Sequence, residues 1–287
     1  MWAALLRAIA PWSAVASLVG LALTSAELGK SRAESGAARP APAPPAAQPT
    51  PSPRPTPDVY TGAVRNPPAE AATACPAGML PVEGNYCPEV EQRCLRYLDG
   101  GGGRFGDFRC AEYAPSRCLS PKRRPMHFCI DEWEHASDGG SLPDNDVSLR
   151  KAERLCAAEG KRVCRESEWN FACEGEEMRP YPYGFSRDSS ACNADHGDLV
   201  GPDGKLRDQR AARGAHPRCE SPFGVHDLSG NLEEMVARDG PGPTRLAMKG
   251  AYWQPSKNHC RAGQYVHDPH YHGTETGFRC CADLPGQ

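Results

Sequence analysis

The sequence predicts a loop-rich α+β fold, a single domain held together by disulfides. The chain contains fourteen cysteines, all between Cys75 and Cys281, and it has no CxxC pair of the kind found in zinc or redox sites. Glycine and proline account for 29 residues each, which is typical of a chain with many turns and little regular structure. Fourteen cysteines without metal-type spacing indicate up to seven disulfides, which form in an oxidising compartment. We therefore expect an extracytoplasmic protein, located in the periplasm, in the cell envelope or secreted.

The first 26 residues have the features of a targeting segment. Arg7 is followed by an apolar run over residues 8–23 and then by three small residues, a pattern typical of signal-peptide cleavage. Because the run approaches the length that spans a bilayer, an uncleaved signal anchor is the alternative. Residues 27–73 are rich in proline and alanine and predict an extended, disordered linker without a core. The folded domain is expected over residues 74–287.

The charge of the chain argues against a nucleic-acid partner. Charged residues make up 24% of the sequence and the formal net charge is −3, with no basic stretch of the kind that binds nucleic acid. We therefore expect no nucleic-acid partner, and contact with a membrane only through the N-terminal segment if it is not cleaved.

The clearest helical pattern covers residues 148–160. Ser148 is a good N-cap for this helix, and Gly160 is a good stop at its far end. One side of the helix carries apolar or small residues, namely Leu149, Ala152, Leu155 and Cys156. Cys156 is therefore placed to join the buried side of this helix to a segment that is distant in the sequence.

A shorter helix is predicted over residues 165–175, with Trp169, Ala172 and Cys173 on one face. The short apolar segments 79–82 and 128–130 fit strands better than helices. Beyond Gly175 the helical patterns disappear and turn sequences dominate, so this part must be held by disulfides, ions or dense hydrogen bonding.

Six motifs then occur in a recognisable order. They are GKRVCRESEWNFACEG (160–175), YPYG (181–184), CNAD (192–195), SPFGVHDLSGNLEEMV (221–236), MKGAYW (248–253) and GFRCC (277–281). Together they resemble the formylglycine-generating enzyme, or sulfatase-modifying factor, family, and the resemblance is strongest over residues 128–281. It implies a single domain related to the C-type lectin-like fold, with little regular structure.

The resemblance also implies two of the disulfides. By position in the motifs, Cys156 would pair with Cys280, and Cys173 would pair with Cys260. Each would close a loop of about 90–125 residues and would stabilise the fold by roughly 4–5 kcal/mol in the chain-entropy model. A third pair, Cys192–Cys219, is expected because it brackets one long loop. The sequence does not predict the disulfide partners of the other cysteines.

The enzymes of this family oxidise a substrate cysteine to formylglycine with two cysteines that hold a copper ion. Here Tyr252 stands at the serine of the GGS motif and Pro255, which has no ligand atom, at the first copper cysteine. Cys260 aligns with either the second copper cysteine or the structural cysteine, and it is catalytic only if it is not disulfide-bonded. We expect the structural role, and therefore no copper cofactor.

The resemblance is thus to an oxidoreductase family whose catalytic pair is not kept. The main hypothesis is a possible pseudoenzyme, a binding or scaffold module for a protein, peptide or glycan of the envelope, and a structural protein without a partner is a further alternative. Glu233 and Met235 replace two aromatic residues of the family pattern, so the cleft should differ in shape and charge.

Calcium is the cofactor that the resemblance favours. One site would take side-chain oxygens of Asp227 and Glu234 with the carbonyls of Gly230 and Leu232. A second site would use Asn193, the Ala194 carbonyl, Asp208 and the Arg210 carbonyl. The alternative for the first segment is a turn with exposed acidic residues.

A different function is suggested by the histidines near the C-terminus. His267, His270 and His272 lie within six residues, and His259 is close in the sequence. Because imidazoles bind iron, copper or zinc, the alternative function is an active oxidoreductase of the family, either formylglycine-generating or using another metal held by these histidines. A polar surface loop is the simpler interpretation of the same residues.

Overall fold

The computed structural model describes residues 75–100, 107–240 and 244–284. The chain divides into two units, Met1–Thr61 and Gly62–Gln287, and every described residue belongs to the second. The predicted targeting segment (1–26) and linker (27–73) therefore lie outside the described residues. Within the described part, no helix is long and apolar enough to cross a membrane.

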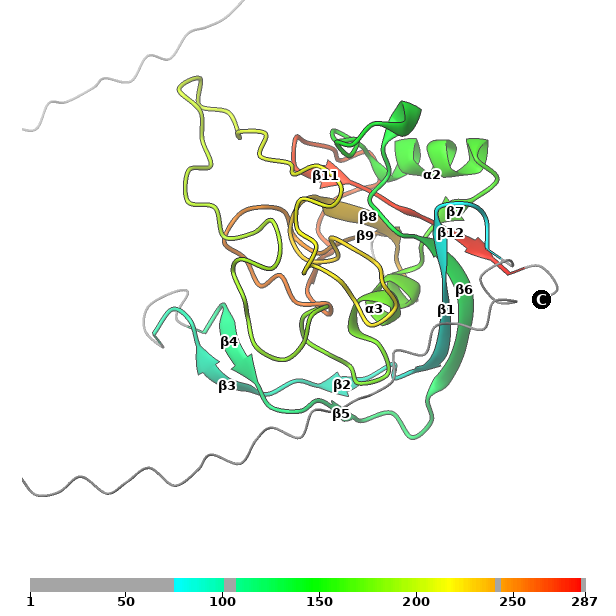
Figure 1. Cartoon of the computed structure of the whole chain (residues 1–287), viewed down its shortest axis with the longest axis vertical. Helices are drawn as coiled ribbons and strands as arrows, with labels where there is room; N and C mark the ends of the chain where they lie inside the picture. Colours follow the sequence, from blue (N-terminus) through cyan, green and yellow to red (C-terminus); the bar gives the residue numbers. More distant parts are fainter. Residues whose placement is uncertain (1–74, 101–106, 241–243, 285–287) are drawn as a thin grey trace, which may run out of the picture. The chain divides into compact units, whose positions relative to one another are not determined.

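Two four-stranded sheets form the framework of the domain (Figure 1). The first has the strand order β1-β6-β12-β7, made from β1 (Met79–Tyr86), β6 (Arg124–Asp131), β12 (Cys280–Asp283) and β7 (Arg162–Val163). The second has the order β10-β9-β8-β11, made from β10 (Gly263–Gln264), β9 (Leu246–Lys249), β8 (Glu233–Ala237) and β11 (Thr276–Gly277). The apolar segments 79–82 and 128–130 lie in β1 and β6, so their prediction as strands is confirmed.

Both predicted helices are present. Helix α2 (Leu149–Ala158) begins after Ser148, whose hydroxyl accepts a hydrogen bond from the Lys151 N–H at 3.3 Å. Helix α3 (Glu166–Glu174) contacts β1 and β6 on one side and β8 and β9 on the other, so it fills the space between the two sheets. A 3-10 turn, η1 (Ser137–Gly139), precedes α2. Trp169 of α3 is fully buried and lies in the larger hydrophobic cluster.

Residues 75–129 form a long two-stranded ribbon, which we call the strap. The chain runs out along β1, β2 (Val90–Glu91) and β3 (Cys94–Tyr97), and it returns along β4 (Cys110–Tyr113), β5 (Arg117–Cys118) and β6. Figure 1 shows the β1/β6 pair along the right side of the domain, with the β2/β5 and β3/β4 pairs following it along the bottom. Three nested disulfides cross-link the ribbon, namely Cys75–Cys129, Cys87–Cys118 and Cys94–Cys110.

All fourteen cysteines lie in described residues, and all of them are bonded. Cys156–Cys280 joins α2 to β12, Cys173–Cys260 joins α3 to the loop after β9, and Cys192–Cys219 closes the long loop, as in the three pairs named from the sequence. The remaining pair is Cys164–Cys281. Adjacent Cys280 and Cys281 therefore anchor β12 to two different segments. Seven disulfides indicate a non-cytosolic protein.

Candidate functional site

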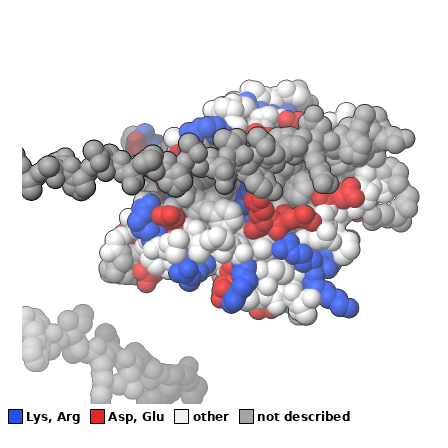
Figure 2. Space-filling view, turned by 60° about the horizontal axis from the view of Figure 1, so that its bottom comes forward, with Lys and Arg blue, Asp and Glu red and all other residues white. Residues whose placement is uncertain are grey.

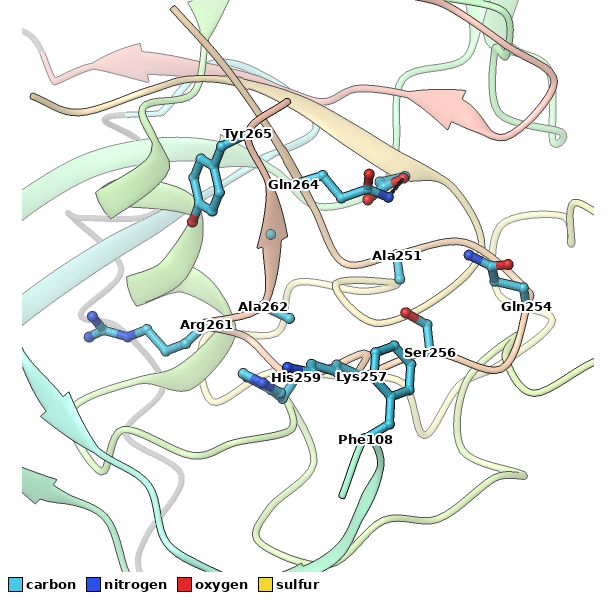
Figure 3. A pocket seen from close by; sticks show the side chains of 12 residues that line it. Phe108, Ala251, Gln254, Ser256, Lys257, His259, Arg261, Ala262, Gln264 and Tyr265 are labelled. Carbon is cyan, nitrogen blue, oxygen red and sulfur yellow. Dashed lines mark hydrogen bonds between the residues drawn. The ribbon is translucent and has the colours of Figure 1, made fainter. Parts of the chain in front are cut away.

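A cavity with a volume of about 510 Å³ lies beside the second sheet. Its wall is formed mainly by the segment that follows β9, together with β10, with Glu233 of β8 and with Phe108 of the strap. Figure 3 shows Phe108, Lys257 and His259 close together at one end, and Gln264 hydrogen-bonded at the other. We call this cavity the cleft. It contains residues 251–265, which include the positions that the sequence resemblance aligned with the copper cysteines.

Cys260 does not present a thiol to the cleft. It is completely buried and bonded to Cys173 of α3, and its N–H donates to the Pro180 carbonyl at 2.7 Å. Pro255 is exposed and offers no ligand atom. The cleft therefore lacks the two thiolates that would hold cuprous ion.

One end of the cleft carries a buried carboxyl group. Glu233 is 3% exposed, and the Gln264 amide donates to its Oε2 at 3.2 Å. Burial raises the pKa of Glu233 to about 7, against the opposing effect of the Gln264 hydrogen bond and with a further contribution from Glu275. Of the two residues that replace family aromatics, only Glu233 lines the cleft, because Met235 packs in the cluster around α2.

The buried Glu233 should make stability depend on pH. A carboxyl whose pKa is near 7 when folded and 4.5 when unfolded stabilises the native state fully below pH 4.5, and this contribution is lost as the pH rises through 7. Relative to Glu233→Gln, wild type should lose about 2–3 kcal/mol of unfolding free energy between pH 4.5 and 8. Urea titrations at several pH values measure the difference. The exposed Glu83→Gln is the matched control, and a flat difference for Glu233→Gln would contradict the assignment.

The other end of the cleft is positively charged. Burial lowers the pKa of His259 to about 3, helped by the charges of Lys249, Lys257 and other nearby cations, so the imidazole is neutral. Its Nδ1 is shielded from solvent and has no hydrogen-bond partner among the described residues. The Lys257 ammonium lies 5.5 Å from the centre of the Phe108 ring. Arg261 points away from the cavity in Figure 3, and it pairs with the buried Glu174 at 2.5 Å.

Lys249 lies behind this end of the cleft and is fully buried. Its ammonium is 3.9 Å from Glu166 and 5.7 Å from the centre of the Trp169 ring, and it has no hydrogen-bond partner within the described residues. Burial lowers the pKa of Lys249 to about 8. The floor of the cleft is thus electropositive near His259, while the opposite end is acidic.

A second hollow continues the cleft. It has a volume of about 300 Å³ and shares Arg261 and Tyr265 with the cleft, while Tyr86 and Asp239 line its far side. The Tyr265 hydroxyl donates to Glu166 at 2.6 Å, which fixes the ring between the two hollows. The two hollows therefore lie side by side, with Arg261 and Tyr265 lining both, and we call the pair the groove.

The residues predicted for the first calcium site are close in space. Asp227 and Glu234 are both buried, which differs from the alternative of a turn with exposed acidic residues. The Glu234 carboxylate is bound by the Arg279 guanidinium, with contacts of 2.7–3.0 Å, and by the Trp169 indole N–H at 2.9 Å. Burial raises the pKa of Asp227 to about 7, with Arg279 opposing and Glu234 contributing. Gly230 has φ 81°, and a Cβ there would collide with the Asn193 carbonyl.

Three buried carboxyl groups share this region with one guanidinium. Burial, and then the charges of Asp227 and Glu234, raise the pKa of Glu134, which accepts hydrogen bonds from the Leu232 N–H at 3.0 Å and from the Asn231 amide. The excess of carboxylates over cations, together with the backbone carbonyls of 230 and 232, fits the hard-oxygen chemistry of calcium. Among the described residues, no group of three Asp, Glu, His or Cys side chains is arranged to hold a metal ion. Most ligands of a calcium ion at this site would therefore be backbone carbonyls.

The second predicted calcium set is engaged in other contacts. Asp208 is held by the Arg210 guanidinium at 2.6 Å. The Asn193 amide donates to the Gln209 carbonyl and to Asn231 Oδ1, both at 2.8 Å, and Ala194 follows in the same loop. The loop is brought to the first site through Asn193, but Asp208 would have to release Arg210 to bind an ion.

The histidines near the C-terminus do not converge. His267 stacks on Tyr271 with ring centres 3.6 Å apart, and His272 Nδ1 lies 2.6 Å from Asp146. His270 is exposed, and His259 lies in the cleft. No group of three metal ligands forms among these described residues. Proximity in the sequence therefore did not bring the four imidazoles together.

Sequence reasoning missed several residues of the cleft. Lys257 and Gln264 lie in a loop and a two-residue strand, which have no periodicity to identify them. Phe108 comes from the strap, outside the motifs, and no signal in the sequence connects it to this site. Charged side chains elsewhere are mixed, as Figure 2 shows acidic and basic residues interspersed on one face.

Comparisons with known proteins agree with the motifs. The family described as "Sulfatase-modifying factor enzyme 1-like domain" matches residues 122–284, more than half of the 287-residue chain. The solved structure of CarF is similar, with 14% identity, a TM-score of 0.48, and coverage of 73% of this chain and 99% of CarF. PvdO from Pseudomonas aeruginosa has 16% identity, a TM-score of 0.44, and coverage of 72% and 94%. By its motifs and by the family match, the chain belongs to the sulfatase-modifying factor family.

Proposed function

We propose that the protein is an extracytoplasmic peptide-binding module that keeps the sulfatase-modifying factor fold without copper-dependent oxidation of cysteine. The observation that carries this proposal is the Cys173–Cys260 disulfide, together with Pro255 at the other copper position. A single family-type cysteine, already bonded, leaves no thiolate pair for the metal. Residues 1–26 would direct export, and residues 27–73 would act as a tether.

An extended peptide is the ligand that suits the groove best. The groove runs past Arg261 and Tyr265 through two hollows, so it accommodates a chain rather than a compact molecule. Its wall includes β10, which is one of the two edge strands of the second sheet and pairs, among the described strands, with β9. Edge strands offer backbone N–H and carbonyl groups to an added strand, while side-chain pockets supply specificity.

The absence of oxidation is tested directly. The full chain, loaded with cuprous ion, is incubated with a cysteine-bearing sulfatase peptide, and the product is analysed by mass spectrometry. We expect unmodified peptide. Cys173→Ser frees the thiol of Cys260 but leaves Pro255 in place, so this variant should also be inactive. Formylglycine in the wild-type reaction would overturn the proposal.

Ligand binding is tested with a positional-scanning peptide library and with an oligosaccharide array. Retention of peptides by the wild-type chain, and loss of retention when Gly263→Pro removes a backbone donor of β10, is the expected result. Circular dichroism confirms that the variant is folded. Retention of oligosaccharides alone would replace the peptide with a glycan as ligand.

We also propose that calcium stabilises the domain at Asp227 and the neighbouring carbonyls. A ligand present at a hundred times its dissociation constant stabilises the native state by about 2.7 kcal/mol. For a domain of this size, this corresponds to a rise in Tm of roughly 5–10 °C between chelator and millimolar calcium. Differential scanning calorimetry measures the shift, which should vanish in Asp227→Asn and persist in Asp208→Asn if the first site dominates. An unchanged wild-type Tm would show that calcium does not bind.

A further inference from the structure

We infer that the Glu233 end of the cleft binds a basic side chain of the peptide ligand. This inference rests on the proposed peptide-binding function and names the chemistry by which the cleft selects its ligand.

The first argument is the unbalanced charge of Glu233. Its carboxyl group is 3% exposed, lines the cavity and receives a hydrogen bond from the neutral Gln264 amide. No ion pair reaches Glu233 from the described residues. A buried carboxylate with one neutral partner is costly, and a cation placed beside it offsets this cost.

Among the described residues, the side chains that act on Glu233 include no cation. Glu275 is near enough for its charge to act on Glu233, and Glu275 itself accepts a hydrogen bond from the Tyr271 hydroxyl at 2.7 Å. Tyr252 feels the negative charge of both carboxyl groups. Two carboxyl groups and tyrosine hydroxyls are hydrogen-bond acceptors for an ammonium or a guanidinium.

The opposite end of the cleft disfavours a basic side chain, which restricts that side chain to the Glu233 end. Lys257 and the cations around His259 make that end positive, and the shielded His259 Nδ1 has no partner within the described part. A basic side chain is therefore repelled from His259 and attracted toward Glu233. The cavity of about 510 Å³ holds one long side chain and its flanking backbone, and the Tyr265 ring contributes an apolar surface for methylene groups.

The test uses the full chain and five fluorescent pentapeptides, acetyl-Gly-Ala-X-Ala-Gly-amide. The central residue X is lysine, arginine, norleucine, Nε-acetyl-lysine or glutamate. We expect the lysine and arginine peptides to bind roughly tenfold more tightly than the norleucine and acetyl-lysine peptides, and the glutamate peptide to bind most weakly. In Glu233→Gln the advantage of lysine over norleucine should disappear. Glu83→Gln changes the charge by the same amount on the exposed face of β1, and it should retain the advantage.

The outcomes separate this inference from the proposed function. If the peptides bind with equal affinity for lysine and norleucine, the basic-side-chain site is wrong but peptide binding stands. If no peptide binds, both are wrong. Should Glu233→Gln fail to fold, competition on the wild-type protein decides. Nα-acetyl-lysine amide, whose side-chain ammonium is free, must displace the lysine peptide, while Nα-acetyl-norleucine amide must not. Equal displacement by both compounds would overturn the inference.

Discussion

Replacing Arg279 with methionine is expected to lower the free energy of unfolding by about 3–5 kcal/mol. The guanidinium is fully buried, it binds both oxygens of the buried Glu234, and it donates to the His226 carbonyl at 2.8 Å. Methionine fills much of the volume but leaves Glu234, and near it Glu134 and Asp227, without the cation that they share. Guanidinium chloride titration of both proteins measures the loss.

The matched control for this prediction is Arg117→Met. Arg117 forms an ion pair with Glu91 at 3.1 Å, but its side chain is 69% exposed, so we expect a change below about 1 kcal/mol. Equal losses for the two variants would mean that the buried network contributes no more than a surface pair. The two variants therefore separate the effect of burying an arginine from the effect of pairing it with a carboxylate.

The second large effect is expected from removal of the Cys173–Cys260 bond. A cross-link over a sequence separation of 87 residues stabilises the fold by roughly 4–5 kcal/mol in the chain-entropy model, because it restricts the unfolded chain. Cys173→Ser/Cys260→Ser also places two hydroxyls in the hydrophobic cluster around α3. We expect a loss of about 4 kcal/mol or more by denaturant titration without reductant.

The strap supplies the comparison for that variant. Cys94 and Cys110 are separated by 16 residues and lie in a pair of edge strands, so Cys94→Ser/Cys110→Ser should cost about 3 kcal/mol or less. If both double variants lose the same amount, neither loop length nor burial determines the effect. The prediction holds if the variant without the Cys173–Cys260 bond loses more unfolding free energy than the variant without the Cys94–Cys110 bond.

Local patterns and motif order were enough to predict much of the framework. Ser148 and the spacing from Leu149 to Cys156 determine a helix because the cap and the buried side coincide. The strands of two residues, such as β10 and β11, could not be predicted, since they are too short to show alternation and exist through pairing with β9 and β8. Tertiary contacts, not local preference, create them.

The candidate site was harder to predict than the framework. The motifs drew attention to Cys260 and Glu233, but the residues that complete the cleft come from loops and from the strap. The six cysteines of the strap allow fifteen pairings, and their spacing does not choose among them. His267, His270 and His272 lie within six residues, but His267 stacks on Tyr271 and His272 contacts Asp146, so sequence spacing alone does not indicate the direction of each ring.

The Cys75–Cys129 bond at the base of the strap has a mechanical consequence. Cys129 lies in β6, an inner strand of the first sheet, and Cys75 is the first described residue of the chain. A pull on the preceding segment is transmitted through sulfur to β6, so β1 cannot be peeled from its neighbour one hydrogen bond at a time. The disulfide would therefore protect the β1–β6 pairing against force applied through the tether that we propose for residues 27–73.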